Sequence, residues 1–152
     1  MYRKFNLLLL NVYRRICLIH WKLKGVTFGS NLRIHGRVVL IGDPRKLKIG
    51  NNVSLNHGVI LNSEGGLIIG DNVTISAYSQ LHSGALSERD LKQHSYAQIL
   101  ISENVWIASA VIVGLGVEIG SNCRIGANSF VNANLEGGYF YAGTPARKIA
   151  KI

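Results

Sequence analysis

An aliphatic residue recurs at every sixth position through the second half of the chain. From position 101 onward the recurring residues are Ile101, Ile107, Val113, Ile119, Ile125 and Val131. Two earlier blocks, from Ile49 to Leu61 and from Ile69 to Leu81, keep the same phase. A strict six-residue unit is too short for a helix pair, and it indicates a solenoid in which one structural unit is stacked on the next.

The repeat predicts a parallel β-helix in which each hexad makes one short strand and one turn. Three hexads close a coil, so about four coils follow position 49, and weaker coils are expected between Val26 and Lys48. Successive coils stack at about 4.8 Å through backbone hydrogen bonds. Because side chains alternate along a strand, each aliphatic residue and the residue two places before it point inward, and the residue between them points outward.

Large residues at outward positions depart from this pattern. Trp106 lies between inward Val105 and Ile107, so its indole is expected outside the coil, where it indicates a subunit contact or a ligand. Ile112 and Phe130 are 18 residues apart and predict an apolar stripe on one face, buried by another subunit. Cys123 occupies an inward position and is interpreted as a core residue rather than a nucleophile.

The position after each core aliphatic residue is normally small, and its exceptions are candidate site residues: Asn56, Asn62, His82 and Asn132. His82 directly precedes Ser83 to Gln98, a polar stretch that abandons the repeat. A long loop leaving a rigid repeat is a common way to build an active site, so His82 is the leading candidate. His94 lies within this loop and is the alternative base.

The first part of the chain is basic. Eleven of the 17 Lys and Arg residues lie between Arg3 and Lys48, and the first acidic residue is Asp43. The segment from Tyr2 to Lys24 mixes apolar and basic residues and predicts an amphipathic helix, with Arg14 and Arg15 interrupting any apolar span. Two interpretations stay open: the helix lies on an anionic membrane surface, or it packs on its own protein or a neighbouring subunit.

The change from a basic, mixed segment to hexads predicts two parts of the chain: a basic N-terminal segment, 1–24, and a β-helix domain, 25–152. The domain is expected to contain a loop at 83–98 and a tail at 137–152. The two cysteines form no disulfide framework, which favours a reducing cytoplasm, with peripheral contact at the inner face of the membrane if the helix binds lipid. The Cys and His residues lack the spacing of a zinc site, so no metal is expected. The basic region lacks a recognisable nucleic-acid-binding module, so no nucleic-acid partner is expected.

The hexads, the segment Ile101 to Ile107 and the ending Ala142 to Lys148 together resemble the left-handed parallel β-helix acyltransferases, in particular galactoside, maltose and surface-polysaccharide O-acetyltransferases. The resemblance covers about residues 49–148. It implies the left-handed coil, a homotrimer with active sites between adjacent subunits, and acetyl-CoA as the donor. The chain departs from the family in lacking its usual helical N-terminal acceptor domain.

Carried over residue by residue, the resemblance makes His82 the catalytic base, since it precedes Trp106 by 24 residues as in galactoside acetyltransferase. Asn56 matches the residue that stabilises the oxyanion, and Glu64 matches the acidic residue near the acceptor, which His94 would also contact. The residues matching donor-binding positions are Trp106, Ser109, Ala127 and Arg147, with Lys148 as a second basic contact to CoA.

These observations favour a CoA-dependent O-acetyltransferase acting on a sugar hydroxyl of a glycan or its precursor. A neutral imidazole is suited to remove the hydroxyl proton, and an Asn amide is suited to stabilise the thioester oxygen. The alternatives are N-acetylation of a nucleotide-linked amino sugar, acetylation of serine, and a non-enzymatic β-helix scaffold. Outward Trp106 and the loop at His82 weigh against the scaffold.

Overall fold

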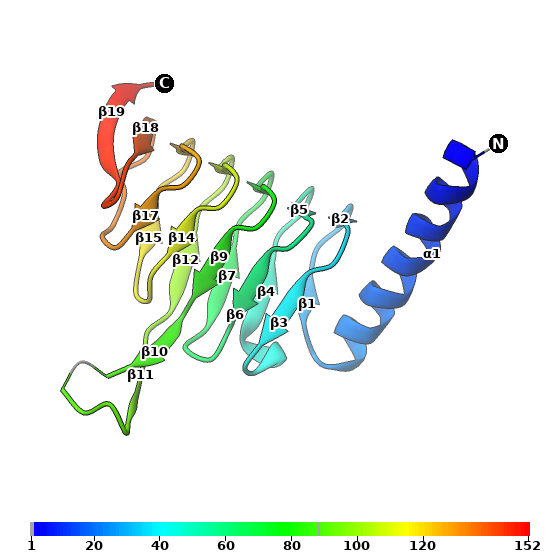
Figure 1. Ribbon diagram of the computed structural model, residues 1–152, viewed down its shortest axis with the longest axis horizontal. Coiled ribbons are helices and arrows are strands. Elements are labelled where there is room, and N and C mark those ends of the chain that lie inside the picture. Colours follow the sequence, from blue (N-terminus) through cyan, green and yellow to red (C-terminus); the bar gives the residue numbers. More distant parts are fainter. Residues whose placement is uncertain (1, 88) are drawn as a thin grey trace.

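The computed structural model describes residues 2–87 and 89–152, with side chains from Asn11 onward. Met1 of the predicted N-terminal segment, Glu88 of the predicted loop and the side chains of Leu7 to Leu10 therefore lie outside the described residues. The strands coil into a three-sided parallel β-helix, with helix α1 (Tyr2–Leu23) at one end of the stack and β18 and β19 at the other (Figure 1).

The strands of each face pair in register from one coil to the next. Face 1 contains β1 (Thr27–Phe28), β4 (Leu47–Ile49), β7 (Leu67–Ile69), β12 (Ile99–Ile101) and β15 (Glu118–Ile119). Face 2 contains β2 (Arg33–His35), β5 (Ser54–Asn56), β8 (Thr74–Ile75), β13 (Trp106–Ile107), β16 (Arg124–Ile125), β18 (Tyr139–Ala142) and antiparallel β19 (Arg147–Lys151). Face 3 contains β3 (Val39–Ile41), β6 (Ile60–Asn62), β9 (Gln80–His82), β14 (Ile112–Val113) and β17 (Phe130–Val131).

The predicted alternation is confirmed by burial. Val105, Ile107 and Cys123 are buried in the core, whereas Trp106 between the first two is 45% exposed. The weak coil expected between Val26 and Lys48 is complete, because β1, β2 and β3 pair with β4, β5 and β6. The buried aliphatic residues therefore form one continuous core along the axis of the coils.

The expected loop is an antiparallel hairpin of β10 (Gly84–Leu86) and β11 (His94–Tyr96), which projects from the middle of the stack (Figure 1). Its predicted first residue, Ser83, is fully buried and is not part of the projection. The Ser83 hydroxyl donates to the Asn62 carbonyl at 2.7 Å and accepts from the Gly65 amide at 3.0 Å. These bonds make Ser83 part of the coil, and the projection begins at Gly84.

Asparagines stack along the corner between faces 1 and 2. Asn31, Asn52, Asn72 and Asn104 each have a φ of 57°, in the left-handed region that most side chains avoid. Their amides form a ladder, with bonds of 3.0 Å from Asn31 to Asn52, 3.2 Å from Asn52 to Asn72 and 3.1 Å from Asn72 to Asn104. Asparagine suits these turns because it tolerates the left-handed conformation and also bonds the next coil.

Replacing Asn72 with alanine is expected to lower the free energy of unfolding by about 1–2 kcal/mol, because alanine resists a left-handed backbone and makes no amide bonds. Asn72→Gly should lower the free energy of unfolding by less, since glycine adopts this φ freely. Urea denaturation of the three proteins measures the difference. Equal losses in both variants would contradict a backbone contribution at this corner.

The C-terminal half of α1 packs on the open end of the coils. Trp21 is 5% exposed and joins the core, Cys17 and Leu18 pack against it, and an Arg14 Nη donates to the Leu32 carbonyl at 2.6 Å. The predicted helix is thus confirmed, and so is the interpretation that part of it packs on its own protein. Within the described part of the chain, no helix has the length and hydrophobicity needed to span a membrane.

Candidate active site

Trp106 borders a pocket on the corner between faces 2 and 3. Its indole N–H donates to the Ser76 hydroxyl at 3.1 Å, which fixes the ring on the outer surface of β13. The pocket has a volume of about 470 Å³. Its lining residues are Ser76, Trp106, Ala108, Ser109, Arg124, Ile125, Gly126, Ala127 and Phe140. The structure thus brings together three of the predicted donor-binding residues, and we call this site the Trp106 pocket.

Strand register explains how these residues meet. Trp106 pairs with Arg124 in the next coil, and Arg124 pairs with Phe140 in the one after. A β-carbon at Gly126 would lie 3.0 Å from Ala142 and 3.3 Å from the Phe140 ring, so this turn has little room for a larger residue. Small residues therefore leave a hollow, and Trp106 and Phe140 give it aromatic walls.

Asn56 lies along the same corner as the Trp106 pocket. It ends β5, and Leu55 before it pairs with Ile75, which in turn pairs with Ile107. Its side-chain amide donates to the Ile75 carbonyl at 3.1 Å. A primary amide has two N–H bonds. Asn56 is therefore held in a fixed orientation with one N–H left for another acceptor.

His82 ends β9 on the next corner, between faces 3 and 1. It pairs in register with Asn62, and its Nε2 lies 2.9 Å from Oε1 of Gln80 on the same strand. With an amide oxygen as acceptor, Nε2 carries the proton and Nδ1 keeps a free lone pair. The side chain is partly buried, and this burial lowers the pKa of His82 from its ordinary value of 6.5. His82 is therefore neutral at pH 7 and able to accept a proton.

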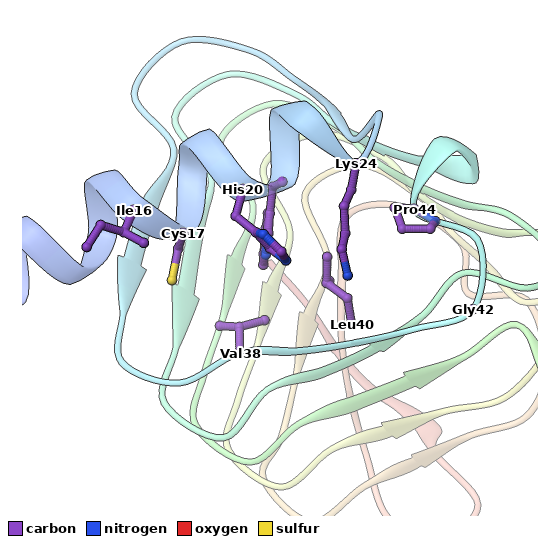
Figure 2. Close-up of a pocket in the computed structure, with 9 residues that line it drawn as sticks. Ile16, Cys17, His20, Lys24, Val38, Leu40, Gly42 and Pro44 are labelled. Carbon is purple, nitrogen blue, oxygen red and sulfur yellow. The ribbon is translucent and has the colours of Figure 1, made fainter.

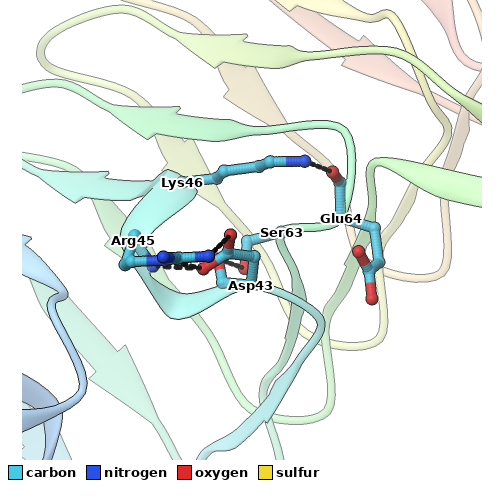
Figure 3. Close-up of polar contacts among 5 residues, drawn as sticks. All are labelled: Asp43, Arg45, Lys46, Ser63 and Glu64. Atoms are coloured by element: carbon cyan, nitrogen blue, oxygen red, sulfur yellow. Dashed lines mark hydrogen bonds and ion pairs between the residues drawn. The ribbon is translucent and has the colours of Figure 1, made fainter.

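Glu64 lies two residues beyond Asn62 on this corner. The Asn62 side chain accepts a hydrogen bond from the Glu64 amide at 3.0 Å, and Lys46 Nζ donates to the Glu64 carbonyl at 2.7 Å. Figure 3 shows the Glu64 carboxylate pointing away from Lys46 and Arg45. The backbone of Glu64 is thus fixed while its acidic group is free of these two cations.

A neighbouring turn supports this arrangement. Asp43 caps the short 3-10 helix η1 (Pro44–Lys46), accepting from the Arg45 amide at 3.0 Å and from its guanidinium at 2.9 Å. These contacts lower the pKa of Asp43 to about 2. The Ser63 hydroxyl donates to the Asp43 carbonyl at 2.8 Å (Figure 3). One network therefore orients Lys46 and the turn that carries Glu64.

His94 belongs to the hairpin rather than to an irregular loop. It lies on β11, is exposed, and stacks on Tyr96 with ring centroids 6.0 Å apart. Tyr96 in turn pairs with Gly84, where a β-carbon would lie 2.9 Å from the Tyr96 ring. The hairpin begins two residues after His82, so His94 is carried on an arm that starts beside the His82 corner.

The two basic residues of the tail have different surroundings. Arg147 is exposed and pairs with Ala142, on the strand that follows the Trp106 pocket along face 2. Lys148 forms an ion pair with Glu136 at 2.6 Å, and its Nζ lies 3.8 Å from the centre of the Tyr139 ring. The Arg147 guanidinium donates to the neighbouring Ala146 carbonyl at 3.2 Å, a bond that it can exchange for one to a ligand, whereas Lys148 is engaged in an ion pair.

The predicted site residues therefore form two groups in one chain. Asn56, Trp106, Ser109 and Ala127 lie on the corner between faces 2 and 3, with Arg147 near its end. His82 and Glu64 lie on the corner between faces 3 and 1. The outer surface of face 3 separates the groups and carries Ile112, 40% exposed, opposite Phe130, 39% exposed.

Several residues of this region were not anticipated from the sequence, among them Phe140 at the wall of the pocket. Arg124 follows Trp106 by 18 residues, so the repeat itself contained the signal that places it in the pocket. Ser76 precedes Trp106 by 30 residues because the hairpin interrupts the spacing. Gln80 is an ordinary outward residue whose bond to His82 depends on side-chain conformation. In the described part of the chain, no group of three His, Cys, Asp or Glu residues is placed to hold a metal ion.

No protein-family model and no curated protein sequence matches the chain. Solved structures do match it. A galactoside acetyltransferase in complex with coenzyme A is 30% identical over 83% of this chain and 64% of its own, with a TM-score of 0.76. A maltose O-acetyltransferase from Clostridium difficile 630 is 26% identical over 95% of this chain and 88% of its own, with a TM-score of 0.75.

A third match is a hexapeptide-repeat acetyltransferase from Vibrio cholerae O1 biovar eltor complexed with acetyl-CoA. It is 26% identical over 80% of this chain and 71% of its own, with a TM-score of 0.71. The chain shares the fold of the hexapeptide-repeat acetyltransferases. These hexapeptide-repeat neighbours support an acyltransferase, and two of them were crystallised with coenzyme A or acetyl-CoA.

Proposed function

We propose that this protein transfers an acetyl group from acetyl-CoA to a sugar hydroxyl of a glycan or glycan precursor. The observation that carries the proposal is the pairing of two different half-sites on either side of face 3. One is an apolar pocket bordered by Trp106 and Arg124, and the other is a partly buried histidine with a lowered pKa. A β-helix that served only as a scaffold would need neither feature.

The Trp106 pocket fits the donor. Its apolar walls suit the pantetheine arm, and the small turns at Ser109 and Ala127 allow a chain to lie against the corner. Arg124 and Arg147 lie toward the same corner and provide guanidinium groups for phosphates. Lys148 would have to leave Glu136 before it could contribute.

The chemistry assigns one step to each polar residue. His82 removes the proton from the acceptor hydroxyl as that oxygen attacks the thioester carbon. The free N–H of Asn56 donates to the thioester oxygen as negative charge develops there. The carbon–sulfur bond then breaks, and the CoA sulfur leaves with the proton that His82 has taken. Glu64 and the hairpin residue His94 orient the acceptor.

A homotrimer joins the two half-sites. Asn56 and His82 lie on different corners of one chain, so neither corner alone contains both the donor pocket and the base. Face 3 lies between these corners, and its exposed Ile112 and Phe130 provide an apolar contact surface. If that surface packs against a neighbouring chain, the His82 corner of one subunit faces the Trp106 pocket of the next.

The proposal is tested by measuring thiol release from acetyl-CoA over a panel of sugars, oligosaccharides and nucleotide-linked sugars. Hydroxyl acceptors should support release well above hydrolysis of acetyl-CoA alone. Amino sugars and serine belong in the same panel. A preference for an amine would assign N-acetylation instead, and the absence of release with every acceptor would contradict the proposal.

Two variants test the donor pocket. Arg147→Ala should raise the KM for acetyl-CoA through loss of a charge-assisted contact, by about tenfold, and leave the acceptor KM nearly unchanged. Trp106→Ala should also weaken the binding of acetyl-CoA without unfolding the coil, because the indole is on the outside. Steady-state kinetics over both substrates measure these effects, and Lys151→Ala is the matched control. An unchanged donor KM in Arg147→Ala would remove this residue from the site.

A further inference from the structure

The outer side of α1 carries a row of exposed aliphatic side chains. Val12, Ile16, Ile19 and Leu23 are 48%, 60%, 61% and 82% exposed. Their spacing of four, three and four residues places them along one side of the helix. We call these four residues the outer stripe of α1. Large aliphatic residues so exposed and so aligned indicate a surface that is covered by a partner.

The position of the outer stripe is fixed by contacts on the other side of the helix. Arg14, Cys17 and Trp21 face the coils, where Trp21 is buried and Arg14 bonds the Leu32 carbonyl. At 3.6 residues per turn, these residues lie opposite the outer stripe. The helix therefore cannot bury both sides against its own coils. Part of α1 packs on the coils, and this packing leaves the second apolar side of the helix facing outward.

Basic residues border the outer stripe on both flanks. Arg15 and Lys22 lie along one flank and are exposed. Lys24 lies along the other flank, where it lines a cavity of about 400 Å³ between α1 and β3 together with His20 and with Ile16 of the outer stripe. Figure 2 shows His20 and Lys24 pointing from the helix toward Val38 and Leu40 at this cavity. No acidic residue occurs in the sequence before Asp43.

We infer that the outer stripe and its basic flanks dock α1 on the surface of an anionic phospholipid bilayer. An apolar row between cationic flanks matches the boundary between acyl chains and anionic headgroups. A second copy of the chain is a poor match, because a symmetric contact through the same helix would place identical basic flanks together. The inference is independent of acetyl transfer, since the outer stripe lies on α1 at the end of the coils and contains none of the residues of either half-site.

Co-sedimentation of the full chain with vesicles tests this inference. The protein should bind vesicles of phosphatidylglycerol and phosphatidylcholine in equal parts, bind phosphatidylcholine vesicles weakly, and be released by high salt. The double variant Ile19→Gln, Leu23→Gln should weaken binding to the anionic vesicles about tenfold or more, because both side chains would no longer enter the bilayer. Ile149→Gln is the control, since Ile149 is 59% exposed on β19 at the opposite end.

Three results would overturn the inference: no binding to anionic vesicles, equal binding to both vesicle types, or equal weakening by the Ile149 control. Dissociation of an oligomer by the Ile19, Leu23 double variant, with vesicle binding unchanged, would assign the outer stripe to a second copy instead. Acetyl transfer to a water-soluble acceptor should stay unchanged in the double variant. That measurement separates a failure of docking from a failure of the proposed function.

Discussion

Replacing His82 with alanine is expected to lower kcat by about 10²-fold or more, because the acceptor hydroxyl loses its general base. Affinity for acetyl-CoA should persist, since His82 does not line the Trp106 pocket. Steady-state kinetics and equilibrium binding of CoA measure the two effects separately. The matched control is His94→Ala, which removes an exposed imidazole from the hairpin and should act chiefly on the acceptor KM.

The pH dependence gives a second readout of the same residue. Protonation of His82 removes the base, and burial lowers its pKa, so kcat/KM should fall only as the pH drops below 6.5. This acid limb should disappear from the residual activity of His82→Ala. An inactive His94→Ala enzyme beside a fully active His82→Ala enzyme would transfer the role to His94. Full activity in both variants would remove the histidine mechanism.

Placing glutamates at Ile112 and Phe130 is expected to abolish both assembly and acetyl transfer. Two carboxylates would have to be buried in an apolar contact, which should weaken association about 10³-fold or more. The coils should survive, because both side chains lie outside the core on face 3. Sedimentation of the variant measures its mass, and circular dichroism measures its fold.

Ile152→Glu provides the control for this experiment, since it adds a carboxylate at an exposed aliphatic position away from face 3. It should have the same mass in solution and the same activity as the unchanged protein. A folded, active monomer of the Ile112, Phe130 variant would refute the site between subunits.

Much of the architecture was predictable because the six-residue period determines whether the side chain at each position points into the core or out of it. Leu81 and Val113 had to be inward, and Trp106 had to be outward, once the phase was known. The same phase separated Asn56 from His82, since one ends a strand of face 2 and the other ends a strand of face 3. Local periodicity was sufficient for these predictions, and no long-range contact had to be guessed.

Other features depended on contacts that periodicity does not encode. Ser83 enters the core because two hydrogen bonds join it to the preceding coil, which a polar residue before a loop does not reveal. The bond from Gln80 to His82 depends on side-chain conformation. The sequence left two roles open for the N-terminal helix because it has apolar residues on two sides. The packing of Trp21 and the bond from Arg14 to the Leu32 carbonyl identify the side that meets the coils.

The hairpin is joined to the coils in a way that leaves the fold independent of its length and composition. Ser83 and Ala97 are linked by a backbone hydrogen bond of 3.0 Å, and β12 then pairs with β7 in the register of the preceding coils. The ends of the projecting segment are therefore adjacent, and the core beneath it is continuous. Such an arm can be exchanged for another of different length or composition while the coils keep their register. Under the proposed function, such an exchange would alter the residues that orient the acceptor and leave the donor pocket and the base in place.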